Sequence, residues 1–304
     1  MKNLIVCLLA ISLSIASSVV AADPNPPPFN GDFTANGRGA SPYTNLPNYN
    51  ANLSANNQDN TAVQGPYHVH VSRHHIIPYN VLQRFYNAVQ RQNSISRLSG
   101  FLKALAKTAP LWYGRQGNAP GAARCGANVY EAGYFAVALA NNWYTQSDDN
   151  QPTGEVLEQF NSFYEFYTWM PWNLFIGPEG AIRSDDPGEG FENNAHVVIG
   201  QTTFNTINAL YQDMLSYITN PNNTVLARIS QSLSRLAARR AVYALNRGDW
   251  VLRNGRWQLD AGRRLASFTP STRLLAVSND VEECGFEFNI APPSTFTYDI
   301  NTLF

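Results

Sequence analysis

Four of the five histidines in the sequence lie within eight residues, at positions 68, 70, 74 and 75, and the fifth is His196. Imidazole is the commonest nitrogen ligand for metals and a natural general base near neutral pH. Side chains alternate along a strand, so adjacent His74 and His75 face opposite sides and can divide labour. One can bind a cation while the other deprotonates a water held beside it. The alternative is structural, with His68 and His70 on a strand surface and His74 and His75 as hydrogen-bonded turn residues.

The segment that holds the histidine pair, Ser72-Arg73-His74-His75-Ile76-Ile77-Pro78, resembles the first motif of the HNH, or His-Me finger, endonucleases. The segment 172–178, which contains Asn173, looks like the second element of that family, and His196 on a predicted helix looks like the third. The resemblance covers well under a fifth of the chain. It implies an α+β, mainly α-helical fold with a small ββα-metal core.

The resemblance also implies a role for each matched residue. His75 would be the general base that activates water, and Asn173 would orient the region of His75 through hydrogen bonds. His74 and His196 would bind one divalent cation, most simply Mg²⁺, with Mn²⁺, Ca²⁺ and Zn²⁺ as alternatives. The cation would stabilise the charge that develops on the scissile phosphate and on the leaving 3′ oxygen.

The spacing departs from the compact family module. Asn173 follows His75 only after a long interval, which requires a helical insertion over residues 80–170. The interval from Asn173 to His196 is also long, so a residue with an oxygen ligand could replace His196 at the cation. The alternatives are Asp186, Glu192 and Asn194.

Charge is strongly sorted along the chain. Residues 131–213 hold twelve acidic residues and a single basic one, Arg183, whereas residues 224–273 hold ten arginines and two aspartates. We expect Arg183 to clamp a phosphate oxygen, or else to pair with Asp185 or Asp186. Arginine suits bidentate contact with phosphate, which predicts a nucleic-acid-binding face made of Arg228, Arg235, Arg239, Arg253 and Arg256. The alternative is that the basic segment neutralises the acidic one within a single fold.

Hydrophobic periodicity predicts the elements that must position these residues. A strand is expected over residues 67–71, and an Asn254-Gly255 turn predicts a hairpin over residues 250–259. Helices are expected over 81–107, with a break near 93–100, and over 129–143, 155–169, 194–217 and 224–246.

The beginning of the chain is typical of an exported protein. Residues 1–22 combine Lys2, an apolar run and a small-residue end, which predicts a secretory signal peptide. An extended arm rich in Pro, Asn and Gly follows over residues 23–65. Residues 66–304 are expected to form one nuclease-like domain, with the Arg-rich segment at 224–275. In an oxidising compartment Cys125 and Cys284 would form a disulfide.

Composition limits the remaining function classes. The 304 residues carry a net charge of −1 and 44% hydrophobic side chains, with a mean hydropathy of −0.27. These values exclude an integral membrane protein and a bulk electrostatic attraction to nucleic acid. We expect a secreted or periplasmic, metal-dependent hydrolase of phosphodiester bonds in DNA or RNA, with no membrane association after signal cleavage. The alternative is a secreted, non-catalytic metal- or anion-binding protein, and a toxin held by a protein inhibitor is a third class.

Overall fold

The computed structural model of the chain describes residues 49–51, 67–116, 127–142 and 154–262. The predicted signal peptide, nearly all of the predicted arm, and both Cys125 and Cys284 lie outside the described residues. Within the arm, β1 (Tyr49–Ala51) pairs antiparallel with β2 (Tyr67–Val69). No helix in the described ranges is both long enough and apolar enough to cross a bilayer.

The described part of the chain is mainly helical and contains three small antiparallel sheets of two strands each. Strand β3 (Val71–His75) pairs with β4 (Leu174–Pro178), and β5 (Trp250–Arg253) pairs with β6 (Arg256–Leu259). The helices are α1 (Tyr79–Arg91), α2 (Ser99–Gln116), α3 (Ala127–Ala140), α4 (Gly154–Thr168), α5 (His196–Ile199), α6 (Gln201–Thr219) and α7 (Asn223–Leu236). Short 3-10 turns lie at Ile95–Leu98, Pro171–Asn173, Gly180–Ile182 and Arg247–Asp249.

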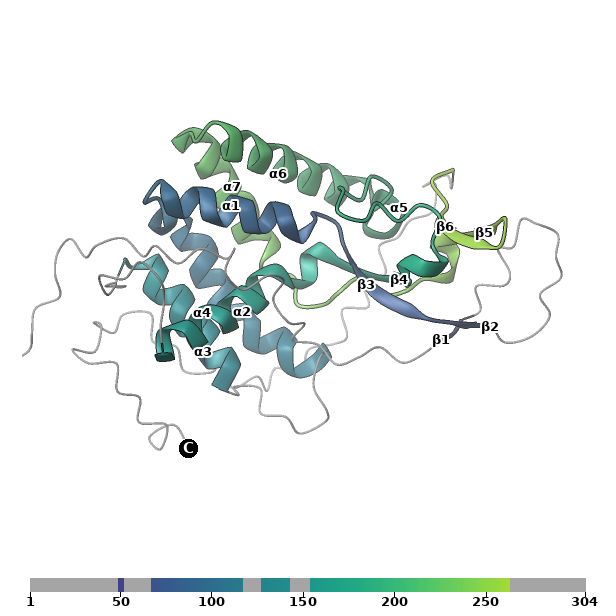
Figure 1. Ribbon diagram of the computed structural model, residues 1–304, viewed down its shortest axis with the longest axis horizontal. Coiled ribbons are helices and arrows are strands. Elements are labelled where there is room, and N and C mark those ends of the chain that lie inside the picture. The colour runs from purple at the N-terminus through teal and green to yellow at the C-terminus, as the bar shows by residue number, and fades with distance from the viewer. Residues whose placement is uncertain (1–48, 52–66, 117–126, 143–153, 263–304) are drawn as a thin grey trace, which may run out of the picture.

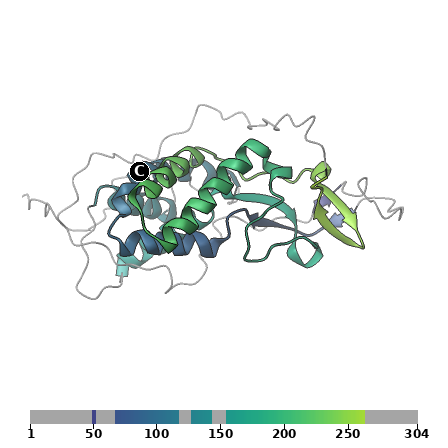
Figure 2. The same ribbon diagram turned by 90° about the horizontal axis from the view of Figure 1, so that it is seen from above.

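The helices and the strands occupy different ends of the molecule. Figures 1 and 2 show α1 to α4, α6 and α7 gathered at one end, with β3 to β6 and α5 at the other. Helices α1 to α4 all lie between β3 and β4 in the sequence. The two strands of the pair that holds the histidines are therefore separated in the sequence by these four helices.

The core of the helical body is aromatic. Tyr86, Phe135 and Phe163 are buried, with ring centroids of Phe135 and Phe163 5.4 Å apart. Tyr167 on α4 donates a hydrogen bond of 3.0 Å to the carbonyl of Leu82 on α1. Burial of each such side chain contributes about 1.5–3 kcal/mol. This packing fixes the end of α4 beside the strand pair, where it meets His75.

Three of the predicted helices differ markedly from their expected ranges. Helix α2 runs beyond residue 107 to Gln116. The helix expected over 194–217 is divided by Gly200, whose φ of +80° favours glycine. Helix α7 stops at Leu236, ten residues early, because Tyr243 pairs in extended conformation with β4, through Ile176 N to Tyr243 O at 2.8 Å. The predicted Asn254-Gly255 turn is confirmed, with positive φ at both residues.

Candidate active site at the histidine pair

The histidine pair lies at the end of β3, opposite the start of β4. His74 is paired with Phe175 and His75 with Leu174. The two imidazoles face opposite sides of the strand, as the alternation predicts. His74 lies on the side of Ser72, whose Oγ is 3.1 Å from its Nε2. His75 faces the end of α4 instead.

Asn173 braces the backbone that follows the histidine pair. Its Oδ1 accepts a hydrogen bond from the N–H of Ile77, and its Nδ2 donates to the carbonyl of the same residue, both at 2.8 Å. The backbone carbonyl of Asn173 also accepts from Ile76 N–H at 2.9 Å. The Asn173 side chain is fully buried. A single amide therefore satisfies both buried polar groups of Ile77 and fixes the turn after His75.

The two ring nitrogens of His74 differ in their surroundings. Nε2 lies 2.8 Å from the carbonyl of Pro178, and because a carbonyl oxygen only accepts, Nε2 donates. In the neutral ring Nδ1 then carries the lone pair, and it faces the carboxylate of Asp186 at 3.6 Å. Burial, aided by the positive charge of Arg183, lowers the pKa of His74 to about 4. His74 is thus neutral at pH 7, with a basic nitrogen directed at a carboxylate.

His75 is held by a backbone carbonyl and an aromatic ring. Its Nε2 donates to the carbonyl of Thr168 at 2.9 Å, and its ring centroid lies 4.8 Å from that of Trp169. The hydrogen bond fixes the proton of the neutral ring on Nε2, which makes Nδ1 the basic nitrogen. Thr168 and Trp169 end α4 and begin the turn that leads to β4. His75 is therefore oriented by the helical body, and His74 by the strand pair.

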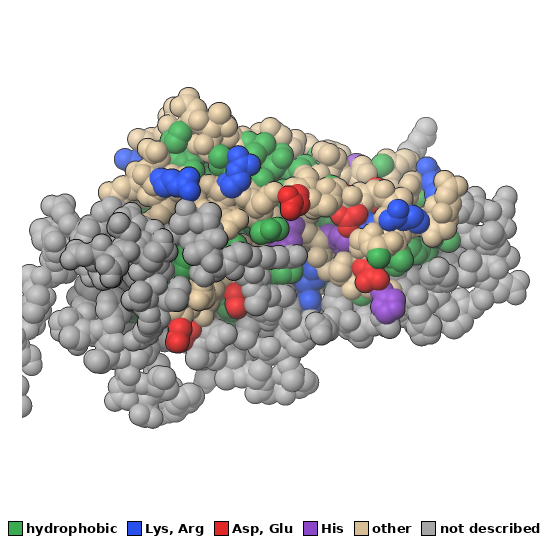
Figure 3. Space-filling view, in the orientation of Figure 1, with side chains coloured by type: hydrophobic (Ala, Val, Ile, Leu, Met, Phe, Trp, Pro, Cys, Tyr) green, Lys and Arg blue, Asp and Glu red, His purple; other side chains and the backbone are tan. Residues whose placement is uncertain are grey.

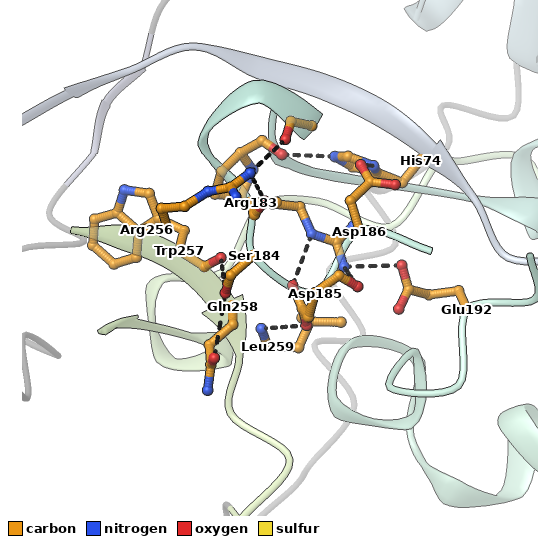
Figure 4. Close-up of polar contacts among 12 residues, drawn as sticks. His74, Arg183, Ser184, Asp185, Asp186, Glu192, Arg256, Trp257, Gln258 and Leu259 are labelled. Atoms are coloured by element: carbon orange, nitrogen blue, oxygen red, sulfur yellow. Dashed lines mark hydrogen bonds and ion pairs between the residues drawn. The ribbon is translucent and has the colours of Figure 1, made fainter. Parts of the chain in front are cut away.

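Arg183 lies at the centre of a buried ion-pair cluster (Figure 4). Its Nε donates to Asp185 Oδ1 at 3.1 Å, and its Nη2 donates to Glu192 Oε2 at 3.0 Å. The guanidinium carbon lies 5.1 Å from the ring centroid of Trp250, and Arg183 is 1% exposed. Burial and two carboxylate partners leave only Nη1 of Arg183 without a hydrogen bond, so the phosphate clamp stays a prediction. The alternative, an ion pair with Asp185, is what the structure shows.

Carboxylates gather around Arg183. The guanidinium is surrounded by three carboxylates, those of Asp185, Asp186 and Glu192, of which Asp186 is the most exposed. Burial raises the pKa of Glu192 to about 7, although its ion pair with Arg183 acts in the opposite direction. Asp186 is held by Gly188 N–H, which donates to its Oδ1 at 2.8 Å, so Oδ2 remains directed at His74.

The expected second histidine ligand lies in different surroundings. His196 Nδ1 is 3.3 Å from the carbonyl of Asn193, and the ring packs edge-on against Phe204, with centroids 5.5 Å apart. Among the contacts of the described residues, none joins His196 to His74. Asn194 contributes its backbone carbonyl to the start of α5, accepting from Val197 N–H. Glu192 is committed to Arg183, so Asp186 alone of the predicted ligands faces His74.

The distance between His74 and Asp186 suits a tetrahedral divalent cation, but these two side chains alone leave its coordination incomplete. Two ligand atoms at about 2.0–2.1 Å from a tetrahedral ion such as Zn²⁺ are about 3.4 Å apart, close to the 3.6 Å between Nδ1 and Oδ2, whereas neighbouring ligands of octahedral Mg²⁺ are about 2.9 Å apart. No group of three or more His, Cys, Asp and Glu side chains that could hold a metal lies within the described residues. Water or substrate oxygens would therefore complete the coordination.

The predicted nucleic-acid-binding arginines divide into two groups. Arg228 pairs with Asp213 at 2.6 and 3.1 Å, Arg239 stacks on Tyr243, and Arg256 donates to the backbone carbonyl of Arg183. Of these contacts, the Arg228–Asp213 pair joins the basic segment to the acidic one, as the neutralising interpretation predicts. Arg235 and Arg253 are exposed. Figure 3 shows Lys and Arg side chains over both the helical end and the hairpin end, with acidic and histidine side chains between them.

Several residues that shape the site were not identified from the sequence. Thr168 and Trp169 orient His75, and Trp250 packs under Arg183, because the fold joins segments about 70–95 residues apart. Gly177 did carry a signal, since an isolated glycine in a strand often marks a close approach. A Cβ there would lie 2.4 Å from Trp250 and 3.3 Å from His74.

Comparison with known proteins identifies no family. No family model matches the chain, and no solved structure matches it. The chain is similar to protein p9 of Acyrthosiphon pisum secondary endosymbiont phage 1, with 34% identity over 164 residues. That match covers 52% of this chain and 42% of the phage protein, so the chain spans less than half of the relative's length. The name of the relative states no activity.

Proposed function

We propose that this protein is an exported, metal-dependent hydrolase of phosphodiester bonds in nucleic acid, built on a ββα-metal core of β3, β4 and the α5–α6 segment. The observation that carries the proposal is the brace between Asn173 and Ile77. From the start of β4, this brace holds the backbone that follows the histidine pair at the end of β3. This is the relation between His-His and Asn that the HNH resemblance implies, across an interval of nearly a hundred residues.

The two histidines have separate tasks in this proposal. His75 is the general base: its Nε2–H is fixed on the Thr168 carbonyl, so Nδ1 accepts the proton of the attacking water. Its imidazolium form keeps that hydrogen bond, because Nε2 remains a donor in both protonation states. Asn173 maintains the position of His75 by fixing the next turn of backbone.

His74 and Asp186 are the residues that would hold the cation. The low pKa of His74 leaves its Nδ1 unprotonated at pH 7, as a ligand must be. Asp186 contributes an oxygen and the negative charge. When bound, a divalent cation polarises the phosphate and stabilises the leaving oxygen. Asp186 replaces His196, the ligand that the resemblance implies, because Asp186 faces His74.

The decisive experiment incubates the protein without residues 1–22 with plasmid DNA and with RNA, in Mg²⁺ or Mn²⁺ and then in chelator. We expect cleavage that stops in chelator. His75→Ala should lower the cleavage rate by at least a hundredfold, the usual contribution of a general base. Circular dichroism should show that the variant remains folded.

His70→Ala is the matched control. His70 directly precedes β3 and its side chain is exposed, so its removal should leave cleavage unchanged. If His75→Ala cleaves as fast as wild type, the assignment of the base is wrong. If the wild-type protein cleaves neither substrate with these cations, nor with Ca²⁺ or Zn²⁺, the protein is not a nuclease, and a non-catalytic binding function replaces the proposal.

A further inference from the structure

One uninterrupted stretch of the chain beside the histidine pair contains no Asp, Glu, Lys or Arg. It covers the twenty residues 193–212, which form α5 and the first part of α6. The exposed positions carry amide and hydroxyl groups instead; they include Asn193, Gln201, Thr202, Asn205 and Gln212. Figure 3 shows this surface, over α6 near α5, as mostly uncharged. Such a surface is suited to an uncharged ligand with hydrogen-bonding groups.

A row of aromatic rings lies within this uncharged surface. Phe191 stacks on Tyr211, with centroids 4.5 Å apart and ring planes at 19°. Phe204 lies 5.8 Å from Phe191 and 5.5 Å from His196. Phe191 is buried, whereas Phe204, Tyr211 and His196 remain partly exposed. The buried ring supports the three that reach the surface.

The aromatic row is tied to the backbone of the histidine pair. Glu192, the residue after Phe191, donates its backbone N–H to the carbonyl of Ile76 at 3.0 Å, one residue beyond His75. On the other side of the site, the exposed Arg253 lies in the β5–β6 hairpin, which is joined to the Asp186 loop through Ser184 and Trp257. An uncharged aromatic surface and a basic one thus border the same centre.

We propose that the aromatic row formed by His196, Phe204 and Tyr211 binds an unpaired nucleobase of the substrate, so that the preferred substrate is single-stranded nucleic acid. The inference rests on the proposed function for the identity of the ligand. Aromatic side chains bind single strands by stacking, since every base has a π-face, while the amides beside them can pair with base edges. Paired bases within a duplex cannot reach such a row.

Binding is measured separately from cleavage, in chelator, by fluorescence anisotropy. The probes are a dye-labelled single-stranded 12-mer, its duplex, and an abasic 12-mer with the same phosphates. Wild type should bind the base-containing single strand at least tenfold more tightly than the other two. Phe204→Ala and His196→Ala should each weaken that binding by about tenfold, from the 1–3 kcal/mol of one stacked base.

Two further variants separate stacking from general damage. Phe204→Trp keeps an aromatic ring, so it should retain binding, and its new fluorescence should be quenched by the single strand. Ile218→Ala removes a partly buried apolar side chain at the far end of the same helix. It should leave the affinity unchanged.

The outcomes distinguish this inference from the proposed function. Base-dependent binding without cleavage would remove the nuclease and leave the nucleobase site standing. Cleavage with equal affinity for base-containing and abasic strands would overturn the nucleobase site and leave the nuclease standing. The inference also fails if the protein binds none of the probes, as expected were the row to bind a protein or a glycan.

Discussion

The neighbouring histidines on the two faces of strand β3 have different surroundings. On one face, His74 lies against a buried network of charges, with Asp186 at 3.6 Å and Arg183 close enough to lower its pKa. On the other face, His75 meets an uncharged backbone carbonyl and the ring of Trp169. The strand thus gives the two neighbouring imidazoles different partners.

This difference shows how one dipeptide can serve two chemical purposes. In the proposed function His74 is a metal ligand, whose nitrogen must stay unprotonated; burial and the nearby Arg183 guanidinium lower its pKa accordingly. In the same proposal His75 is the general base, which must take up a proton and return it. The alternation of side chains along the strand provides both without any additional residue between them.

The largest expected effect follows from removing the charge at the centre of the His74 face. Arg183→Met leaves the buried carboxylate of Glu192 and the partly buried one of Asp185 without their partner, which should lower the free energy of unfolding by about 3–5 kcal/mol. Urea denaturation measures the change. Arg235→Met, at an exposed position on α7, is the control. A loss below about 1 kcal/mol would mean that the cluster is solvated rather than buried.

The other face has its own test in Asn173→Ala. The substitution leaves the N–H and C=O of Ile77 buried without their partners, so we expect a loss of about 2–4 kcal/mol in unfolding free energy. Cleavage should be lost with it. Asn173→Asp keeps the acceptor for Ile77 N–H and should recover part of the stability. An equal loss in both variants would contradict the two-bond brace.

The pH dependence of stability should differ between two single variants. The pKa of His74 is lowered from 6.5 to about 4, so protonation costs the folded state, and stability falls as pH drops through that interval. The pKa of Glu192 is raised from 4.5 to about 7, so ionisation costs the folded state, and stability falls as pH rises through that interval. In wild type the two slopes oppose each other.

Each variant should therefore reveal the other group's slope. In chelator, the urea midpoint of Glu192→Gln should rise with pH between about 4 and 6.5. That of His74→Gln should fall with pH between about 4.5 and 7. Slopes of the same sign in both variants would show that the two groups do not titrate as described.

A smaller effect is expected from a methyl group placed beside Asp186. A Cβ at residue 180 would lie 2.8 Å from Asp186 Oδ2, so Gly180→Ala should displace the carboxylate from His74. We expect Mn²⁺ to bind about fivefold more weakly, a change of about 1 kcal/mol, as measured by isothermal titration calorimetry. Gly262→Ala, whose Cβ would make only an ordinary contact at 3.7 Å, is the control. Unchanged Mn²⁺ affinity would exclude Asp186 as a ligand.

The smallest effect should come from the exposed pair of Arg228 and Asp213. Ion pairs in full contact with solvent add little to stability, so Arg228→Ala should leave the unfolding midpoint within experimental error. Its affinity for nucleic acid should also stay close to that of wild type, because the guanidinium is already bound to a carboxylate. A large loss of affinity would restore Arg228 to the predicted binding face.

Local signals in the sequence predicted the local parts of this structure. The alternation of His74 and His75, the Asn254-Gly255 hairpin and most helices follow from short-range patterns, and all are present. The residues that contact them in the fold are harder to predict from the sequence. Asp186 is one of several candidate ligands in the sequence, because no pattern shows which of them lies against β3 in the fold. The contacts of Arg183 depend on its burial, which the distribution of charge along the sequence does not indicate.

The long insertion between the strands has a consequence for the newly made chain. The contacts that orient His75 join it to residues 93 to 99 positions later, at or beyond the end of the fourth intervening helix. Contacts of such sequence separation form late in folding, after the intervening segment has become ordered. A nascent polypeptide that has not yet reached residue 173 thus carries both imidazoles but lacks their supporting amide. Any hydrolytic activity would be silent until most of the protein has been synthesised.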